Sequence, residues 1–189
     1  MEKQIEMATV GAKKSVTATI KIDWLLYDIM NETYLRGRTI QNKDNHKEVA
    51  SMFASEDEEN REKILRSVKR AFSQVKSEIS EYLDETGTGS DNIPHDGTSD
   101  LVLNLKMPSN FNEAATSGIA EAVHDYIKNI AVSDWYLVTN KADSADYFQL
   151  AAGSMVMIQQ AMSKRSRPSK PLEKVVTPGD DVEIKGEGS

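Results

Sequence analysis

Two short segments of alternating apolar and polar residues, far apart in the chain, most strongly constrain how it can fold. They are "SVTATIKID" (15–23) and "DLVLNLKMP" (100–108). Their apolar positions are Val16, Ala18, Ile20 and Ile22 in the first and Leu101, Leu103, Leu105 and Met107 in the second. Such alternation predicts half-buried strands. The segments are too distant for a tight hairpin. We therefore expect an antiparallel ribbon whose apolar face lies on helices, since two strands alone are marginal in water.

Apolar residues spaced three and four apart predict four main helices in the rest of the chain. The first helix follows the first strand directly, with Asp23 as its cap and Gly37 as its stop. A loop is expected at 38–48, leading to a short helical turn. The second helix is expected to begin at Ser55, ahead of a run of acidic residues, and to span about eight turns.

The third and fourth helices are predicted to form a hairpin around "DWYLVTNKADSADYF" (134–148). The third begins near Ser109 or Asn112 and runs through the tryptophan of this segment. The fourth begins near Asp143 or Ser144 and ends at the basic, proline-containing stretch that follows it. Aromatic side chains are expected to close the core of the hairpin. The candidates are Trp135, Tyr147 and Phe148.

The expected fold is mainly α: a helical bundle of about four helices, a small two-stranded antiparallel β ribbon and an extended C-terminal arm. Only 6% of the residues are aromatic, so the core must rest largely on aliphatic side chains. We divide the chain into an N-terminal tail (1–14), a helical domain (15–165) and the arm (166–189). The arm lacks a helical period but has short strand potential, which could add strands to the sheet edge of a partner. The candidate partner contacts in the arm are Val175, Val176, Val182 and Ile184.

Composition excludes several classes of protein. The chain has no cysteine, which excludes disulfides, thiolate metal sites and cysteine nucleophiles. No stretch approaches the about 18 unbroken apolar residues that a membrane helix needs. The N-terminus lacks the apolar middle region of a secretory signal. The formal net charge of −7 argues against a protein that coats nucleic acid.

The sharpest candidate for metal binding is the pair Glu121 and His124. Glu-x-x-His spacing places both side chains on one face of a helix, as in carboxylate-bridged di-iron bundles. Those bundles need a second such motif and two further carboxylates, and this chain has a single motif. The alternative, which we favour, is a histidine that hydrogen-bonds at a helix interface.

A long polar loop is predicted at 87–100, with oxygen-rich and imidazole side chains. It lacks the spacing and the terminal glutamate of a calcium-binding loop, so we interpret it as a solvated loop. Nowhere does the sequence combine a nucleophile with a base and an orienting group. We therefore expect no catalytic, cofactor-binding or metal-binding residues, and a protein that is not an enzyme. The loop residues considered are Asp91, His95, Asp96 and Asp100.

The segment "KRSRPSK" (164–170) has two interpretations. Its cations could contact DNA phosphates or an acidic protein surface, or they could form a charged helix end followed by a solvated linker. Met157, which lies off the main apolar stripe of the fourth helix, is a candidate for an intersubunit surface. The candidate partner contacts in the basic segment are Lys164, Arg165, Arg167 and Pro168.

The order of these elements resembles a known family. The most specific marks are "LNLKMPSNFN", the run "HDYIKN…DWYLVTN" and the basic, proline-containing ending. Over about residues 15 to 171 the chain resembles head–tail connector (adaptor) type neck proteins of Bacteroides tailed phages and prophages. The resemblance implies a virion structural protein, made in the bacterial cytoplasm. It also implies a homo-oligomeric ring, commonly of twelve copies, docked beneath the portal protein.

Such a ring continues the channel for double-stranded DNA and contacts the next neck or tail protein. The acidic balance suits a channel wall, because like charge repels DNA. Two alternatives remain open. The chain could be another neck or tail component, such as a stopper, a tail terminator or a podovirus ring protein. It could also be a helical nucleic-acid-binding regulatory protein that uses "KRSRPSK".

Overall fold

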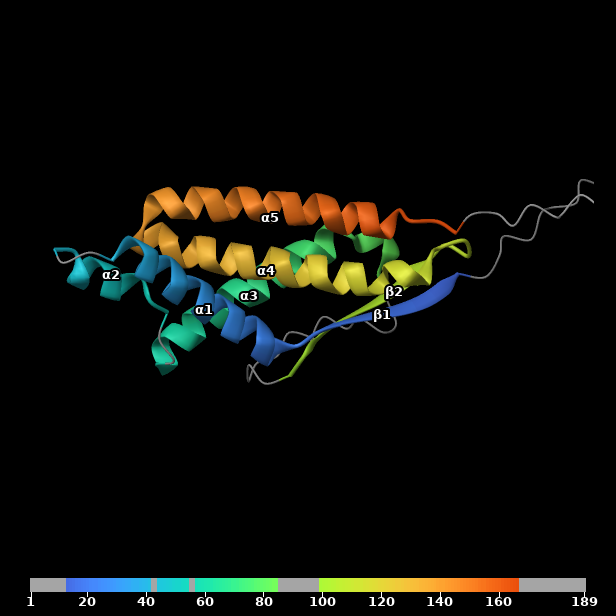
Figure 1. Ribbon diagram of the computed structural model, residues 1–189. Coiled ribbons are helices and arrows are strands. Elements are labelled where there is room, and N and C mark those ends of the chain that lie inside the picture. The colour runs from blue at the N-terminus through green and yellow to red at the C-terminus, as the bar shows by residue number, and fades with distance from the viewer. Residues whose placement is uncertain (1–12, 42–43, 55–56, 85–98, 167–189) are drawn as a thin grey trace, which may run out of the picture.

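The computed structural model describes residues 13–41, 44–54, 57–84 and 99–166 (Figure 1). Within these ranges, five α-helices and a two-stranded antiparallel sheet make up the fold, which confirms the expected mainly α class. Residues 1–12 of the predicted N-terminal tail, most of the loop 87–100 and the arm beyond Ser166 lie outside them, while Lys14, assigned to the tail, is the first residue of β1. The elements are β1 (Lys14–Ile20), α1 (Ile22–Ile40), α2 (His46–Met52), α3 (Glu58–Glu78), η1 (Ser80–Tyr82), β2 (Leu101–Met107), η2 (Glu113–Ala115), α4 (Thr116–Thr139) and α5 (Lys141–Met162).

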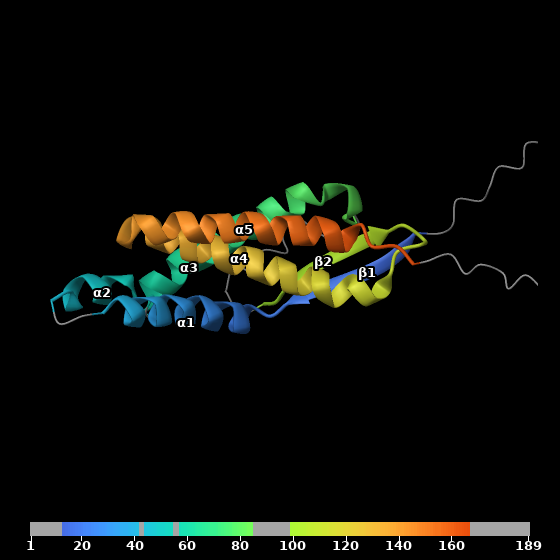
Figure 2. The same cartoon turned by 45° about the horizontal axis from the view of Figure 1, so that its top comes forward.

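Helix α4 lies at the centre of the molecule. It packs along nearly its whole length against α5, and it also contacts α3, α1, α2 and β1. Figure 2 shows α1 along one side of α4, with α5 and the end of α3 on another. This central position explains why α4 is apolar around most of its circumference, with twelve buried residues among its 24.

The ribbon forms in the predicted antiparallel sense, with Val16 opposite Leu105 and Ala18 opposite Leu103. All of its buried residues are apolar, as the alternation required. The first strand ends at Ile20, and Ile22 already belongs to α1.

The cap of α1 comes from a different part of the chain than predicted. Asp23 lies inside the first turn of α1 and does not cap it. Instead, Asp100, which immediately precedes β2, accepts hydrogen bonds from the backbone N–H of Ile22 (3.3 Å) and from Lys21 Nζ (2.5 Å). The hydrogen bond from Lys21 holds the pKa of the Asp100 carboxyl below its usual value. Strand pairing thus supplies the acceptor that the start of α1 lacks locally.

Gly37 does not end the first helix, which continues to Ile40. The residue is buried, and a Cβ built on it would lie 2.4 Å from Cε1 of Phe53. Glycine is therefore needed here because the ring of Phe53, which follows α2, packs against the helix backbone. The sequence signal for a helix stop is in fact the mark of a close tertiary contact.

We expect Gly37→Ala to destabilise the protein. Overpacking costs about 1–3 kcal/mol, which exceeds the about 0.5–1 kcal/mol that alanine gains over glycine inside a helix. Urea unfolding measures the loss. Adding Phe53→Leu should recover part of it, because the shorter side chain makes room for the new methyl group. A Gly37→Ala protein as stable as the wild type would show that Phe53 moves aside at no cost.

The other helices differ from expectation mainly at their ends. Helix α3 spans 21 residues, about six turns, and is followed by η1. Its predicted cap, Ser55, lies outside the described residues. Asn112 caps η2 by accepting from the N–H of Ala114 (3.1 Å). Helix α5 begins two residues earlier than predicted, because Asn140 is its N-cap and accepts from the N–H of Asp143 (3.5 Å).

The predicted hairpin of α4 and α5 forms, but its core differs from the prediction. Trp135 and Tyr147 are buried as expected, whereas Phe148 is 62% exposed, so its assignment to the core was wrong. Tyr147 already takes the inward position, and the residue after it on a helix turns about 100° away. The missing core member is Tyr136, which is fully buried beside Tyr147 with ring centroids 5.7 Å apart.

Candidate functional site

The part of the basic cluster that the structure describes acts as a helix cap. Arg165 Nη1 donates to the carbonyl oxygens of Met162 (2.8 Å) and Lys164 (3.2 Å), at the C-terminal end of α5. The N–H of Ser166 donates to the carbonyl oxygen of Asn110 (2.8 Å), which ties the start of the arm to the chain before α4. Lys164 is exposed. The remaining candidate contacts lie outside the described residues: Arg167, Pro168, Val175, Val176, Val182 and Ile184.

The histidine of the Glu-x-x-His pair contacts a different carboxylate. His124 Nε2 lies 2.9 Å from Asp28 Oδ2 of α1, while Glu121 is exposed. In the ranges that the structure describes, no group of three or more histidine, aspartate or glutamate side chains could hold a metal ion. His124 therefore serves the described fold as a hydrogen-bonding residue between α1 and α4. Of the candidate calcium loop only Asp100 is described, and it caps α1.

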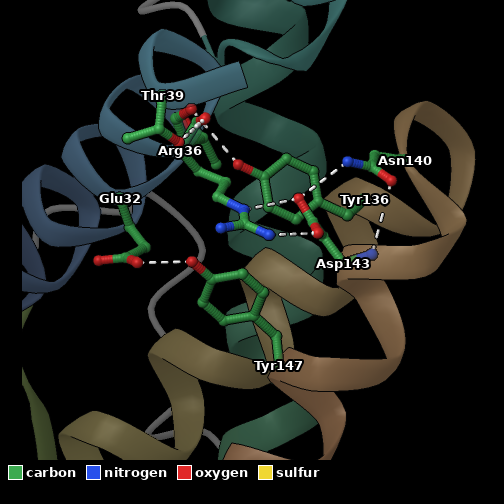
Figure 3. Close-up of polar contacts among 8 residues, drawn as sticks. Glu32, Arg36, Thr39, Tyr136, Asn140, Asp143 and Tyr147 are labelled. Atoms are coloured by element: carbon green, nitrogen blue, oxygen red, sulfur yellow. Dashed lines mark hydrogen bonds and ion pairs between the residues drawn. The ribbon is translucent and has the colours of Figure 1, made fainter.

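A partly buried polar network joins α1 to the α4–α5 joint and includes Tyr136, whose hydroxyl donates to the carbonyl oxygen of Thr33 (Figure 3). Asp143, which is 6% exposed, accepts from Arg36 Nε (2.8 Å) and Nη2 (2.7 Å), a bidentate ion pair. Asn140 Nδ2 donates to the same carboxylate (2.8 Å), and the Tyr147 hydroxyl donates to Glu32 Oε1 (2.5 Å). Hydrogen bonding to Asp143 raises the pKa of Arg36. The members of the network satisfy one another's hydrogen bonds, so we interpret it as structural.

The two tyrosines of the network stay neutral at any ordinary pH. Burial is the main cause that raises the pKa of Tyr136 and of Tyr147, and the hydrogen bond to Glu32 adds to it for Tyr147. A tyrosine is neutral below its pKa, so both groups favour folding while the pH is below the unfolded value of about 10. Their contribution to stability is lost as the pH rises from there toward the higher pKa of the folded state.

We therefore expect the free energy of unfolding to fall as the pH rises above about 10. In the native protein, the near-ultraviolet absorbance of phenolate should lack the contribution of the two buried tyrosines until the chain unfolds. Tyr147→Phe should reduce the slope of stability against pH, because it removes one of the two groups. A slope unchanged by this substitution would show that Tyr147 ionises equally well in the folded and unfolded states.

The most unusual surface is the outer face of α1, formed by Trp24, Tyr27, Tyr34 and Leu35. These side chains are 72%, 67%, 47% and 51% exposed. They lie on the side of α1 opposite the buried Leu25, Leu26 and Ile29, because helical residues three, four and seven apart share a face. A surface helix normally carries charged residues there. Clustered exposed aromatic side chains on such a face mark an interaction site.

A second apolar surface, the α3/α5 groove, lies on another side of α4. It has a volume of about 330 Å³ and is hollowed between Gln74 and Glu78 of α3 and the exposed Phe148 of α5. Tyr126 and Ile130 of α4 form part of its lining. Phe148 is therefore exposed because its side chain lines this groove instead of the hairpin core. Met155 is half-buried and lines the groove, Met157 is exposed and Met162 is buried.

A third feature is a hollow of about 460 Å³ where α1 begins. It is bordered by the end of β1, the first turns of α1 and one face of α4. Its lining combines the indole of Trp24 with three carboxylates and one lysine. That lysine, Lys21, is already paired with Asp100. We call this feature the acidic hollow; its charged and polar members are Thr19, Lys21, Asp28, Glu121, His124 and Asp125.

The outer face of α1 was missed in reading the sequence. The apolar stripe that predicts this helix consists of Ile22, Leu25, Leu26, Ile29 and Met30, and it does not include the aromatic residues of the outer face. The available signal was a second stripe, at Trp24, Tyr27 and Tyr34, on the opposite side. A helix that is apolar on two opposite sides can bury only one of them against its own core.

Comparison of the chain with protein-family models, with curated proteins and with solved structures found no match. Among the described helices, none is long and apolar enough to cross a membrane. Three surface features are the candidate binding sites of the described chain: the outer face of α1, the α3/α5 groove and the acidic hollow. All three are suited to holding another polypeptide.

Proposed function

We propose that this chain is a non-enzymatic structural protein of a phage neck. In the proposed assembly, copies of the chain form a ring between the portal and the tail, and the ring continues the channel for double-stranded DNA. Its partners are the portal protein on one side and the next neck or tail protein on the other. The protein is made in the host cytoplasm and resides in the virion. The formal net charge of −7 supports a channel wall that does not retain DNA.

The outer face of α1 is the single observation that carries the proposal. Trp24 and Tyr27 are each more than two-thirds exposed in the isolated chain. Tryptophan and tyrosine are enriched at the centres of protein interfaces and depleted from ordinary surfaces, because covering them gains much apolar burial for little loss of side-chain freedom. A subunit that exposes them in a row along one helix is suited to assembly.

The position of the second apolar surface favours a ring over a symmetric dimer. Residues of α4 that face the groove, such as Tyr126, lie on a different side of that helix from Tyr136, which donates to the carbonyl oxygen of Thr33 in α1. Figure 2 likewise shows α1 and the pair α3 and α5 on different sides of α4. Two different surfaces on one subunit permit head-to-tail contacts, and such contacts close into rings when the rotation between copies allows it.

The test is the mass and shape of the purified full chain. We expect native mass spectrometry and electron microscopy to find a closed ring of defined copy number. Tyr27→Lys should dissociate it, since loss of an interface aromatic costs about 2 kcal/mol or more, roughly a 30-fold loss in affinity per contact. Ser73→Lys, on the exposed side of α3, is the matched control and should leave the ring intact. A wild-type chain that stays monomeric at high concentration would contradict the proposal.

Binding partners then distinguish the neck protein from its alternatives. A connector should bind a portal protein encoded beside it, whereas a stopper or tail terminator should bind only a tail component. Retention of DNA by the purified chain that falls steeply with salt would favour the regulatory alternative. The regulatory alternative needs the basic cluster to bind DNA, and the guanidinium of Arg165 already caps α5.

A further inference from the structure

We infer that the acidic hollow of one copy binds the segment "RPSKP" (167–171) at the start of the C-terminal arm of a neighbouring copy. This inference rests on the proposed ring, because it names the contact by which one subunit holds the next. The proposed contact through the outer face of α1 does not say what fills the hollow or what the arm does. The inference answers both questions.

The chemistry of the hollow fits a cationic, proline-containing peptide. Trp24, 72% exposed, forms one wall. Asp28, Glu121 and Asp125 supply carboxylates, of which Asp28 also contacts His124 and Asp125 also pairs with Lys128, so the exposed Glu121 is the main acceptor for a new cation. Proline-rich segments with the spacing P-x-x-P adopt an extended left-handed helix that docks on exposed aromatic side chains. An adjacent arginine can stack on an indole and pair with carboxylates at the same time.

The segment has the matching chemistry. Pro168 and Pro171 have P-x-x-P spacing, with Arg167 before them and Lys170 between them. The stretch from Lys164 to Lys174 carries five cations and a single glutamate. Arg165 already caps α5, so the cations that we assign to the partner contact are those from residue 167 onward. The carboxylates and the indole of the hollow thus match the cations and the prolines of the segment.

Geometry favours a neighbouring copy over the same chain as the source of the segment. The described chain ends at Ser166, whose hydroxyl lies 3.5 Å from the carbonyl oxygen of Phe111, and Lys14 Nζ donates to that same oxygen. The arm therefore starts beside the first residue of β1, whereas the hollow borders its last residues, Thr19 and Ile20. The strand between these points spans about 20 Å. Arg167 follows Ser166 directly and cannot cross that distance.

The start of the arm is also held in a fixed direction. The N–H of Ser166 donates to the carbonyl oxygen of Asn110 (2.8 Å), and Arg165 pairs with Phe111 as an isolated β-bridge. These contacts fix where the segment leaves the subunit. A peptide that leaves a rigid body at a defined point loses less freedom when it binds a neighbour at a defined distance, which raises its effective concentration.

Disulfide trapping tests the inference, and the lack of any native cysteine keeps its background low. Full-length Thr19→Cys and Ser169→Cys chains are mixed and oxidised. We expect a disulfide-linked heterodimer, and we expect its loss when Trp24→Ala is added to the first chain or Arg167→Ala to the second. Ser73→Cys on α3, paired with Ser169→Cys, is the matched control and should give little product.

The outcomes separate this inference from the proposed function. A ring that assembles without forming the heterodimer above the level of the control overturns the docking and leaves the ring standing. A heterodimer formed by copies that never close into a ring supports the docking and overturns the ring. A double variant, Thr19→Cys with Ser169→Cys in one chain, that closes only within itself shows that the hollow binds its own arm and overturns the inference.

Discussion

Replacing Trp135 with alanine is expected to lower the free energy of unfolding by about 3–5 kcal/mol, the largest effect of any substitution considered. Trp135 is 6% exposed, so the substitution leaves a large cavity beside α4. Its indole N–H donates to the carbonyl oxygen of Met52 at the end of α2 (2.8 Å), and Lys63 Nζ lies 4.7 Å from the centre of the ring. One side chain therefore holds α2 and the start of α3 against α4, and the substitution removes both contacts together with the buried indole.

Two control substitutions separate the stability gained by burying the indole of Trp135 from the stability gained by its hydrogen bond. Trp135→Phe keeps much of the apolar burial but leaves the carbonyl oxygen of Met52 without this donor, and should cost about 1–3 kcal/mol. Phe148→Ala removes a comparable aromatic from an exposed position and should change stability by no more than about 0.5 kcal/mol. Denaturant unfolding of the three variants measures their losses of stability and so ranks them. A Trp135→Ala protein that is fully stable and still assembles would overturn this account.

Removing Arg36 is expected to have the second largest effect. Arg36→Met should cost about 2–3 kcal/mol, because it leaves the carboxylate of Asp143 buried without its bidentate partner. The side chain of Asp143 is 8% exposed and that of Arg36 is 42% exposed. The cost falls below that of a fully buried pair, since Asn140 Nδ2 still donates to the carboxylate and the start of α5 favours negative charge.

A double-mutant cycle tests this explanation. Asp143→Asn removes the charge that Arg36→Met would leave unpaired, so the double variant should be more stable than the sum of the two single losses predicts. Additive losses would show that Arg36 acts through packing alone. Because Arg36 anchors α1 to the α4–α5 joint, Arg36→Met should also weaken ring assembly through the outer face of α1, which native mass spectrometry of the same variants can report.

The sequence predicted those parts of the fold that depend on periodicity. The alternation at residues 15–20 and 101–107 was enough to predict two paired strands and the face that each buries, because a shift of one residue would turn the apolar side chains to solvent. The expected antiparallel sense is confirmed, although alternation alone does not distinguish it from a parallel pair. The hairpin of α4 and α5 was likewise predicted from periodicity. The ends of helices were less predictable: Asp23 and Gly37 are good local signals, but Asp100 caps α1 and Phe53 requires the glycine.

The candidate site was less predictable than the fold. Of the two interpretations of the basic cluster, the charged helix end is confirmed for Arg165, which caps α5. Phe148, which was expected in the hairpin core, lines a surface groove instead. The outer face of α1 was missed, since aromatic residues in a helix ordinarily indicate core. The acidic hollow could not be foreseen, because β1, α1 and α4 bring its members together from positions about a hundred residues apart.

By itself, then, the sequence determined which segments are helices and strands and which face of the ribbon is buried. These properties depend on residues within a few positions of one another, where spacing fixes which side chains share a face. Only the tertiary structure decided which aromatic residues are covered. Burial depends on which helices pack together: α1 has one side against α4 and its other side open, and Tyr136 takes the place predicted for Phe148. The surfaces that carry the proposed function are those that folding left uncovered.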